Sequence, residues 1–135
     1  MTPHPKPSRK SPTPRKPMKR SRLKPRNTKR RKSEFARIYG SRQRVEWVKA
    51  QPCIACGRRG YCDSAHIETG GMGKKAHYTK TVPLCGHLWS IVDNCHKEAH
   101  RGQETFATKY GIDLEEEAAK CERAWNLFQE ERNGR

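Results

Sequence analysis

The first 33 residues contain no acidic side chain and no aromatic residue. Their apolar content is two methionines and one leucine, so apolar burial cannot offset an ordering cost of about 1–2 kcal/mol per residue. The whole chain also lacks an apolar run close to the roughly 18 residues that cross a bilayer. Its basic start has no following apolar segment of the secretory type. These absences predict a disordered N-terminal segment, no membrane partner and a cytoplasmic location.

Positive charge is concentrated in this same segment. The chain has 30 Lys and Arg residues, 14 Asp and Glu residues and a formal net charge of +16, and residues 1–33 hold fourteen of the basic residues and seven of the nine prolines. The prolines favour an extended chain that spaces the cations along a flexible arm. We therefore expect residues 1–33 to be a disordered basic arm that binds a polyanion, most commonly nucleic acid. A solubilising tail, a localisation tag and a contact with anionic lipid are the alternatives. The candidate contacts nearest the rest of the chain are Arg30, Arg31 and Lys32.

Residues 34–135 are close to charge balance, with sixteen basic and fourteen acidic side chains, and we expect them to form a single domain. The segment "EFARIYGSRQRVEWVKA", residues 34–50, is typical of one or two short helices. Ser33 and Ser41 are the expected N-caps of these helices.

The C-terminal part predicts two further helices. Gly111 is expected to end a short helix over residues 103–110. Asp113 and Glu116 form a capping box for a long helix over residues 113–131. Apolar residues step along one face of that helix by four, three, four and three positions. They are Leu114, Ala118, Cys121, Trp125 and Phe128.

Six cysteines in a basic chain without a secretory signal argue against disulfides. The segment "PCIACG" has the Cys-x-x-Cys spacing at which two thiolates chelate one ion, and four sulfurs in tetrahedral geometry make a closed structural zinc site. Cys62 and His87 compete for the places of the second pair. The set that we favour for structural zinc is Cys53, Cys56, Cys85 and Cys95.

Between these cysteines the chain reads as strand, loop, strand and helix. "YCDSAHI" predicts a strand, "TKTVPLC" predicts its hairpin partner, and residues 91–101, "IVDNCHKEAHR", predict a helix. His96 and His100 are four residues apart, so they share one face of that helix. The arrangement brings His66 opposite this face.

This pattern resembles the HNH, or ββα-metal, nuclease superfamily. "HKEAHRG" is similar to the His-x-x-x-His-Arg-Gly ending of nuclease colicins. "CIACG", "AHIETGGMGKKAH", "VPLC" and "CHKEAH", followed by "FATKYGIDL", resemble small phage and prophage HNH proteins that include relatives of the recombination nuclease Ref. The similarity covers about residues 50–115. It implies an α+β fold with a small zinc-stabilised ββα-metal core, flanking helices and a disordered basic arm.

The resemblance also implies a metal-dependent DNA endonuclease that leaves 5′-phosphate ends. In such an enzyme His66 is the general base, and His96 and His100 hold a catalytic Mg²⁺, Mn²⁺ or Zn²⁺ ion. Many relatives have a metal ligand directly before the base, where this chain has Ala65. Asp63 lies on the same side of the strand as Ala65, so we expect it to reach the ion.

DNA is the expected partner, with a recombinase filament as a further one and no small-molecule substrate. The alternative is a zinc-containing DNA-binding or recombination accessory protein without catalysis. The residues expected to hold the DNA backbone in the folded domain are Lys74, Lys75 and Arg101.

Overall fold

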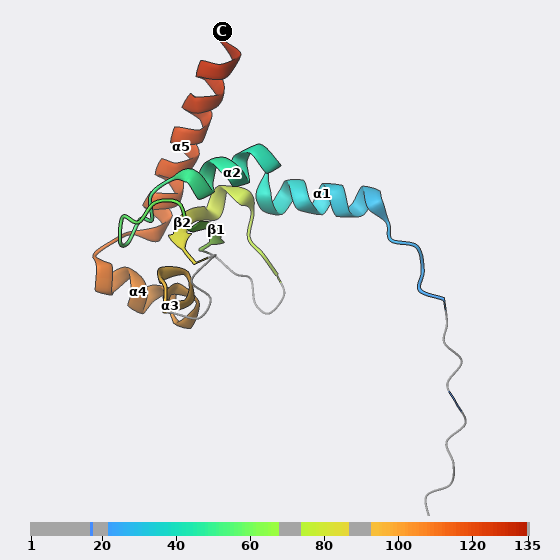
Figure 1. The fold of residues 1–135 in the computed structure, drawn as a ribbon, viewed down its shortest axis with the longest axis horizontal. Helices are drawn as coiled ribbons and strands as arrows, with labels where there is room; N and C mark the ends of the chain where they lie inside the picture. The colour runs from blue at the N-terminus through green and yellow to red at the C-terminus, as the bar shows by residue number, and fades with distance from the viewer. Residues whose placement is uncertain (1–16, 18–21, 68–73, 87–92, 135) are drawn as a thin grey trace, which may run out of the picture.

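The computed structural model of the chain describes residues 17, 22–67, 74–86 and 93–134. Helices surround a small two-stranded sheet, which confirms the predicted α+β class (Figure 1). The elements are α1 (Thr28–Tyr39), α2 (Arg42–Ala50), β1 (Cys62–His66), the 3-10 helix η1 (Tyr78–Lys80), β2 (Thr81–Cys85), α3 (Cys95–Arg101), α4 (Gln103–Tyr110) and α5 (Leu114–Asn133).

The two strands form the predicted antiparallel hairpin. Cys62 pairs with Cys85 at one end of the ladder, and His66 pairs with Thr81 at the other. All five residues of β2 are buried, because helices pack against the sheet. Residues 68–73, which belong to the loop expected between the strands, lie outside the described residues.

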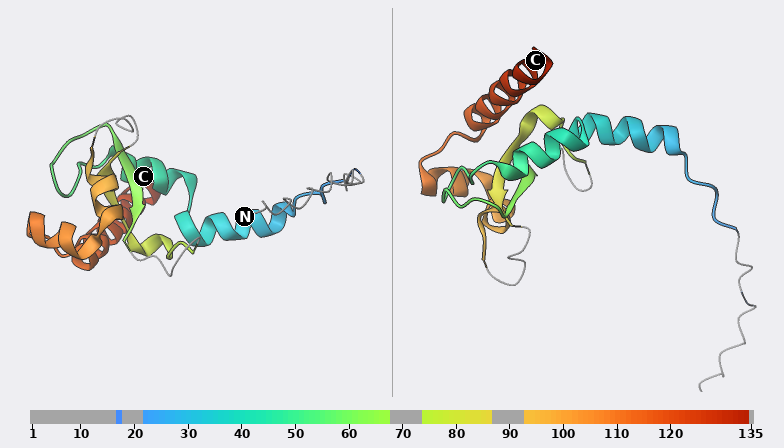
Figure 2. Two further views of the ribbon diagram at one scale, coloured as in Figure 1. Left: turned by 90° about the horizontal axis from the view of Figure 1, so that it is seen from below. Right: turned by 45° about the horizontal axis from the view of Figure 1, so that its top comes forward.

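Helix α1 begins earlier than predicted. Its N-cap is Asn27, whose side-chain oxygen accepts a hydrogen bond from the backbone N–H of Arg30 at 3.0 Å. The prediction that Ser33 caps this helix is therefore wrong, and residues 28–33 are helical rather than part of a disordered arm. Lys and Arg are good helix formers, so a capped first turn outweighs the repulsion among these cations. None of the residues of α1 is buried, and in Figures 1 and 2 it projects from the body of the protein.

Helix α2 starts at the predicted N-cap, Ser41, and contains a buried arginine. Arg44 is 1% exposed and donates hydrogen bonds to Thr81 Oγ1 and to Glu122 Oε2, both at 2.8 Å. It therefore connects α2 to β2 and to α5. Because loss of one partner leaves a buried charge uncompensated, such a pair costs about 3–5 kcal/mol to break.

The C-terminal helices follow the predicted boundaries closely. Gly111 ends α4 in the left-handed conformation, with φ of 63°, where glycine has no steric penalty. The side chain of Asp113 accepts hydrogen bonds from the N–H groups of Glu115 and Glu116. The side chain of Glu116 pairs with Arg123 at 3.0 Å, so only the Asp113 half of the predicted capping box forms. Ala118, Cys121 and Trp125 are the buried residues of α5.

The core lies between the sheet, α3, α4 and the first half of α5. Its largest fully buried apolar side chains include Val82, Leu84 and Phe106. None of the described helices is both long and apolar enough to span a membrane.

Candidate functional site

The four predicted cysteines converge. The Sγ atoms of Cys53, Cys56, Cys85 and Cys95 all lie within 4.8 Å of one another. The Sγ atoms of Cys56 and Cys85 are 3.7 Å apart. Four sulfurs at about 2.3 Å from a tetrahedral zinc ion lie roughly 3.8 Å from one another. The cluster could therefore hold a structural metal ion such as zinc, and we refer to these four residues as the cysteine cluster.

Three separate segments supply its ligands. The Cys-x-x-Cys turn closes at Gly57, whose φ of 74° suits glycine. The N–H of Ile54 donates to the carbonyl oxygen of Pro83 at 3.1 Å, and this bond holds the turn beside β2. Cys85 is the last residue of β2 and Cys95 is the first of α3. A metal ion here would therefore tie the turn, the sheet and α3 together.

The acid–base properties of the cluster favour a cation. Burial raises the pKa of Cys85 and of Cys95 above the ordinary value for a thiol. Burial acts in the same direction on Cys56, but hydrogen bonds from the backbone at Arg58 and from the neighbouring cysteines bring its pKa below that value. Several negative thiolates in a buried cluster repel one another. A divalent ion offsets that repulsion and holds the thiols deprotonated.

Cys62, one of the two competing ligands, is not in this cluster. Cys62 is buried, and its Sγ donates to the carbonyl oxygen of Arg58 at 3.5 Å. Burial and the nearby cysteine charges raise its pKa to about 12, so it is a protonated thiol. His87 lies outside the described residues.

A second group of possible ligands lies on α3. The helix begins at Cys95 rather than at residue 91, because Asn94 caps it by accepting from the N–H of Lys97 at 2.8 Å. His96 and His100 are one turn apart, and their Nε2 atoms are 3.1 Å apart. Two nitrogens at about 2.0–2.1 Å from one tetrahedral ion lie roughly 3.3 Å apart. The pair therefore fits a single divalent ion.

Asp63 contacts the other side of the His96 ring. Its Oδ2 accepts from His96 Nδ1 at 3.0 Å, and its direct contact with an ion stays a prediction. The bond to His96 fixes the tautomer that leaves the His96 Nε2 lone pair available. Gly86 makes this bond possible, because a Cβ there would lie 2.7 Å from Asp63 Oδ2. Gly86 was not predicted to be a site residue, although it directly follows Cys85 in "VPLCG".

His66 lies at the end of β1 and is held by α1. Its Nε2 donates to the carbonyl oxygen of Ile38 at 2.7 Å, so Nδ1 carries the lone pair. Burial lowers the pKa of His66, the positive charges of Lys75 and Arg44 lower it further, and the bond to Ile38 opposes them. The ring is therefore neutral near pH 7. The role of Ile38, which is 28 residues away, was not predicted.

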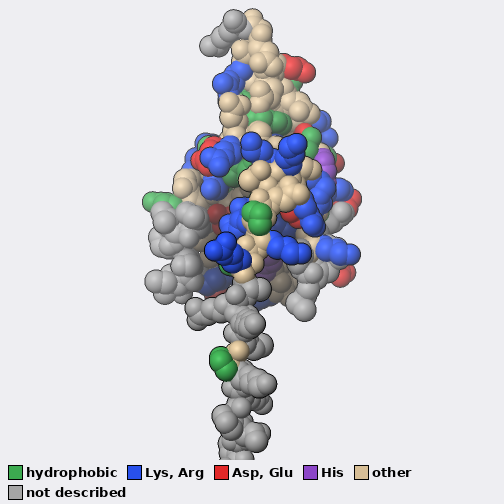
Figure 3. Space-filling view, turned by 90° about the vertical axis from the view of Figure 1, so that its right-hand side faces the viewer, with side chains coloured by type: hydrophobic (Ala, Val, Ile, Leu, Met, Phe, Trp, Pro, Cys, Tyr) green, Lys and Arg blue, Asp and Glu red, His purple; other side chains and the backbone are tan. Residues whose placement is uncertain are grey.

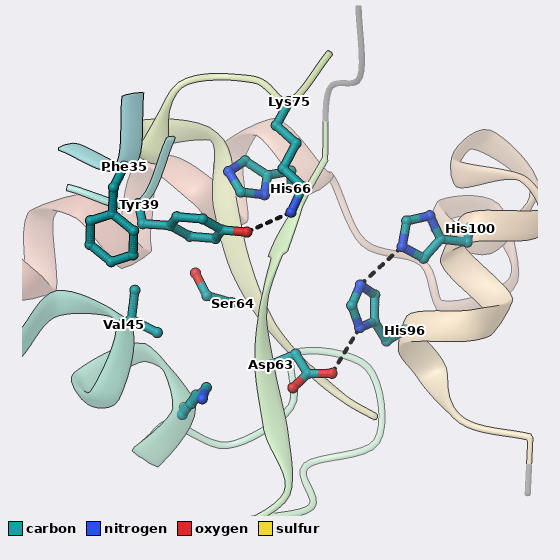
Figure 4. A pocket seen from close by; sticks show the side chains of 10 residues that line it. Phe35, Tyr39, Val45, Asp63, Ser64, His66, Lys75, His96 and His100 are labelled. Atoms are coloured by element: carbon teal, nitrogen blue, oxygen red, sulfur yellow. Dashed lines mark hydrogen bonds and ion pairs between the residues drawn. The ribbon is translucent and has the colours of Figure 1, made fainter. Parts of the chain in front are cut away.

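One cavity brings these groups together (Figure 4). Its volume is about 520 Å³. Figure 4 shows Phe35 and Tyr39 on one side of β1 and the His96–His100 pair on the other. The pKa of His100 is lowered, first by burial and then by the charges of His96 and Lys75. We call this space the histidine cavity; it is lined by Phe35, Tyr39, Val45, Lys49, Asp63, Ser64, His66, Lys75, His96 and His100.

The predicted DNA contacts have different surroundings. Lys75 lines the histidine cavity and its Nζ donates to the hydroxyl of Tyr39 at 2.5 Å. Lys74 is exposed beside the cavity-lining Lys75. Arg101 pairs with Asp93 at 2.9 Å on the surface of α3. The remaining three, Arg30, Arg31 and Lys32, are exposed on α1.

Comparisons with known proteins place the chain in a family. The curated protein "Uncharacterized protein YdfU" of Escherichia coli (strain K12) is 39% identical over 74 residues, which are 53% of this chain and 19% of that protein. The chain therefore spans about a fifth of that relative's length. No solved structure matches. Residues 25–127 match the family described as "Protein of unknown function (DUF968)". That range includes both the cysteine cluster and the histidine cavity, and the chain belongs to this family.

Proposed function

We propose that the protein is a metal-dependent DNA endonuclease with an HNH-type ββα-metal core. The observation that carries the proposal is that a neutral, oriented His66 and a metal-compatible histidine pair line the same cavity. A strand that ends in a candidate base, its hairpin partner and a helix that bears two nitrogen ligands follow the element order of that superfamily. The cysteine cluster supplies a separate structural zinc site in this proposal.

His96 and His100 would hold the catalytic divalent ion through Nε2, while Asp63 orients the His96 ring. A bound divalent ion supplies Lewis-acid stabilisation of the charge on the phosphate and on the departing 3′ oxygen, worth several kcal/mol. Two protein ligands leave coordination positions for substrate and water, which is the usual difference between a catalytic and a structural site. The lowered pKa of His100 keeps its nitrogen available as a ligand.

His66 is the general base. Its Nδ1 accepts a proton from the water that attacks phosphorus, while its Nε2–H stays bonded to Ile38. A base of this kind contributes typically about 10²–10⁴-fold to the rate. The bond between phosphorus and the 3′ oxygen breaks, so the products are a 5′-phosphate and a 3′-hydroxyl. Lys75, at the cavity wall, is positioned to contact the phosphate.

The charge of the protein supports DNA as the substrate. Lys and Arg side chains predominate on the face from which α1 projects (Figure 3). Arg30, Arg31 and Lys32 are exposed on that helix, and ten more basic residues precede Asn27 in the sequence. Phosphate contacts by such cations give affinity without sequence preference. A recombinase filament remains the further proposed partner, through a DNA strand that both proteins bind.

The test is cleavage of plasmid and single-stranded DNA by zinc-loaded protein with added Mg²⁺ or Mn²⁺. We expect the wild type to cut and the His66→Ala variant to lose about 10²–10⁴ in rate. His77→Ala is the matched control, because His77 is an exposed histidine whose side chain hydrogen-bonds to nearby Thr79. A wild type that cuts neither DNA with either ion would overturn the proposal. Equal cleavage by His66→Ala would overturn the assignment of the base.

The second candidate is a zinc-containing DNA-binding protein without catalysis. Asp63, His96 and His100 hydrogen-bond to one another in the chain, so they can also form a satisfied polar cluster without an ion. This candidate predicts DNA binding that is unchanged by Mg²⁺ or Mn²⁺ and no cleavage in the same assay.

A further inference from the structure

Helix α1 presents two aromatic rings to the histidine cavity. Phe35 is 39% exposed, and both Phe35 and Tyr39 line the cavity with ring centroids 5.2 Å apart. Neither residue belongs to the core, and α1 buries none of its residues. The two rings therefore lie outside the buried core. Their position at the cavity points to contact with a ligand.

The two rings adjoin the candidate catalytic groups. The Tyr39 ring meets the His66 ring edge-on, with centroids 5.4 Å apart. Lys75 Nζ lies 5.1 Å from the centroid of the Tyr39 ring and also bonds to its hydroxyl. The cavity thus combines aromatic faces with a cation a short distance from the proposed base (Figure 4). This combination suits a ligand with a planar ring and an attached anion.

We propose that the cavity binds an unpaired nucleobase of the strand that is cut, stacked against Phe35 and Tyr39. The substrate is then single-stranded DNA or DNA with a locally unpaired nucleotide. This inference rests on the proposed function, which places the phosphate between His66 and the His96–His100 pair. Bases within a duplex are covered by their neighbours, so only an unstacked base can offer its face to a protein ring.

Size and charge favour this occupant. The volume of about 520 Å³ lies within the roughly 300–1,000 Å³ of typical small-ligand sites, which accommodates one nucleotide. Lys49 and Lys75 are the cations that line the cavity. The carboxylate that lines it, Asp63, is bonded to His96. The exposed cations of α1 lie next to the rings along the same helix, so a strand on this helix is held by its phosphates while its base enters the cavity.

The test uses zinc-loaded His100→Ala protein, which keeps α1 and His66, and an oligonucleotide that contains the fluorescent base 2-aminopurine. Stacking on an aromatic ring quenches this base. We expect quenching with the single strand and none with the same strand in a duplex. Phe35→Ala should lower single-strand affinity on the order of tenfold, the effect of one lost base–aromatic stack. Phe35→Tyr should restore it, and Leu127→Ala, which removes an exposed apolar side chain from α5, should leave it unchanged.

The outcomes separate this inference from the nuclease proposal. Unchanged quenching in both Phe35→Ala and Tyr39→Leu overturns the base site. A loss of duplex affinity in Phe35→Ala as large as its loss of single-strand affinity also overturns it. If the wild type cleaves DNA but does not quench 2-aminopurine, the nuclease proposal stands and the base site is ruled out. If the wild type cuts no DNA but quenches 2-aminopurine, and Phe35→Ala loses this quenching, the base site is supported and the nuclease proposal is ruled out. The Phe35→Ala and Tyr39→Leu proteins should both retain zinc and the wild-type thermal midpoint, because α1 buries no residue.

Discussion

Two adjacent residues of α3, Cys95 and His96, belong to different sites: the first to the cysteine cluster and the second to the histidine cavity. Cys95 is 6% exposed and joins three other sulfurs, whereas His96 is half-buried and lines an open cavity with His100. Successive residues of a helix point about 100° apart, so the first turn of α3 can serve both sites. Four protein ligands close an ion off from substrate, and two leave it accessible. The number of ligands therefore separates a structural site from a proposed catalytic one.

Removing a cysteine ligand is expected to have the largest effect. Cys95→Ser should abolish zinc binding and most of the cooperative thermal transition, because metal binding in such sites contributes about 10–16 kcal/mol to folding. Cys62→Ala is the matched control, since Cys62 is an equally buried cysteine outside the cluster. It should keep its zinc and lose only about 1 kcal/mol. Metal analysis and thermal unfolding measure both effects, and a Cys95→Ser protein with full zinc content would contradict the assignment.

Deleting residues 1–26 should weaken DNA binding without changing either site. The deletion removes ten basic residues and spares Asn27, the cap of α1. If five or six of those cations contact phosphates, the slope of log affinity against log salt should become less steep by about 5. Binding titrations at several salt concentrations measure the slope. An unchanged slope and affinity at low salt would show that these residues do not contact DNA.

Replacing Asp63 should weaken metal binding at the His96–His100 pair and leave the cysteine cluster unchanged. Asp63→Ala removes the acceptor at His96 Nδ1, and losing such a support typically costs about 10–100-fold in metal affinity or activity. The zinc content should remain unchanged because Asp63 is not in the cysteine cluster. Asp93→Ala is the control, since Asp93 is an exposed carboxylate that pairs with Arg101. Cleavage titrated with Mn²⁺ measures the change, and equal rates in the two variants would argue against a supporting role for Asp63.

The pH dependence of cleavage should show the lowered pKa of His66. The neutral ring is the base, so the rate should fall about tenfold per pH unit below its pKa. Because burial and the Lys75 charge lower that pKa, the fall should begin below the ordinary value of about 6.5. Because Lys75→Met removes this positive charge, it should shift the pH at which the rate begins to fall to a higher value. Single-turnover rates at saturating metal ion measure the profile, and a midpoint at or above 6.5 in the wild type would contradict this environment for His66.

Local signals in the sequence predicted much of the fold and of the metal cluster. The two strands of the hairpin and the cap at Asp113 were read from short stretches of sequence, and they were confirmed. The convergence of the four cysteines was also confirmed as a geometry that could hold a metal ion. The start of α1 was misplaced because the scarcity of apolar residues was taken to predict disorder through residue 33, while the N-cap signal of Asn27 was overlooked.

Long-range contacts were not predictable in the same way. Arg44 is an ordinary charged residue in the sequence, but it is buried, and Thr81 and Glu122, 37 and 78 residues away, accept hydrogen bonds from its two terminal nitrogens. The bond from His66 to Ile38 likewise depends on how α1 packs against the sheet. Pattern and spacing identify which residues bear chemistry. The tertiary packing decides which atom of each residue is available for it.

The most direct test of two separate metal sites is metal content and DNA cleavage measured on the same preparations of wild type and His100→Ala. Our account predicts one tightly bound zinc ion in each protein after dialysis. It also predicts cleavage on addition of Mg²⁺ or Mn²⁺ by the wild type alone. Cleavage by His100→Ala at the wild-type rate, or a loss of zinc together with activity in that variant, would contradict it.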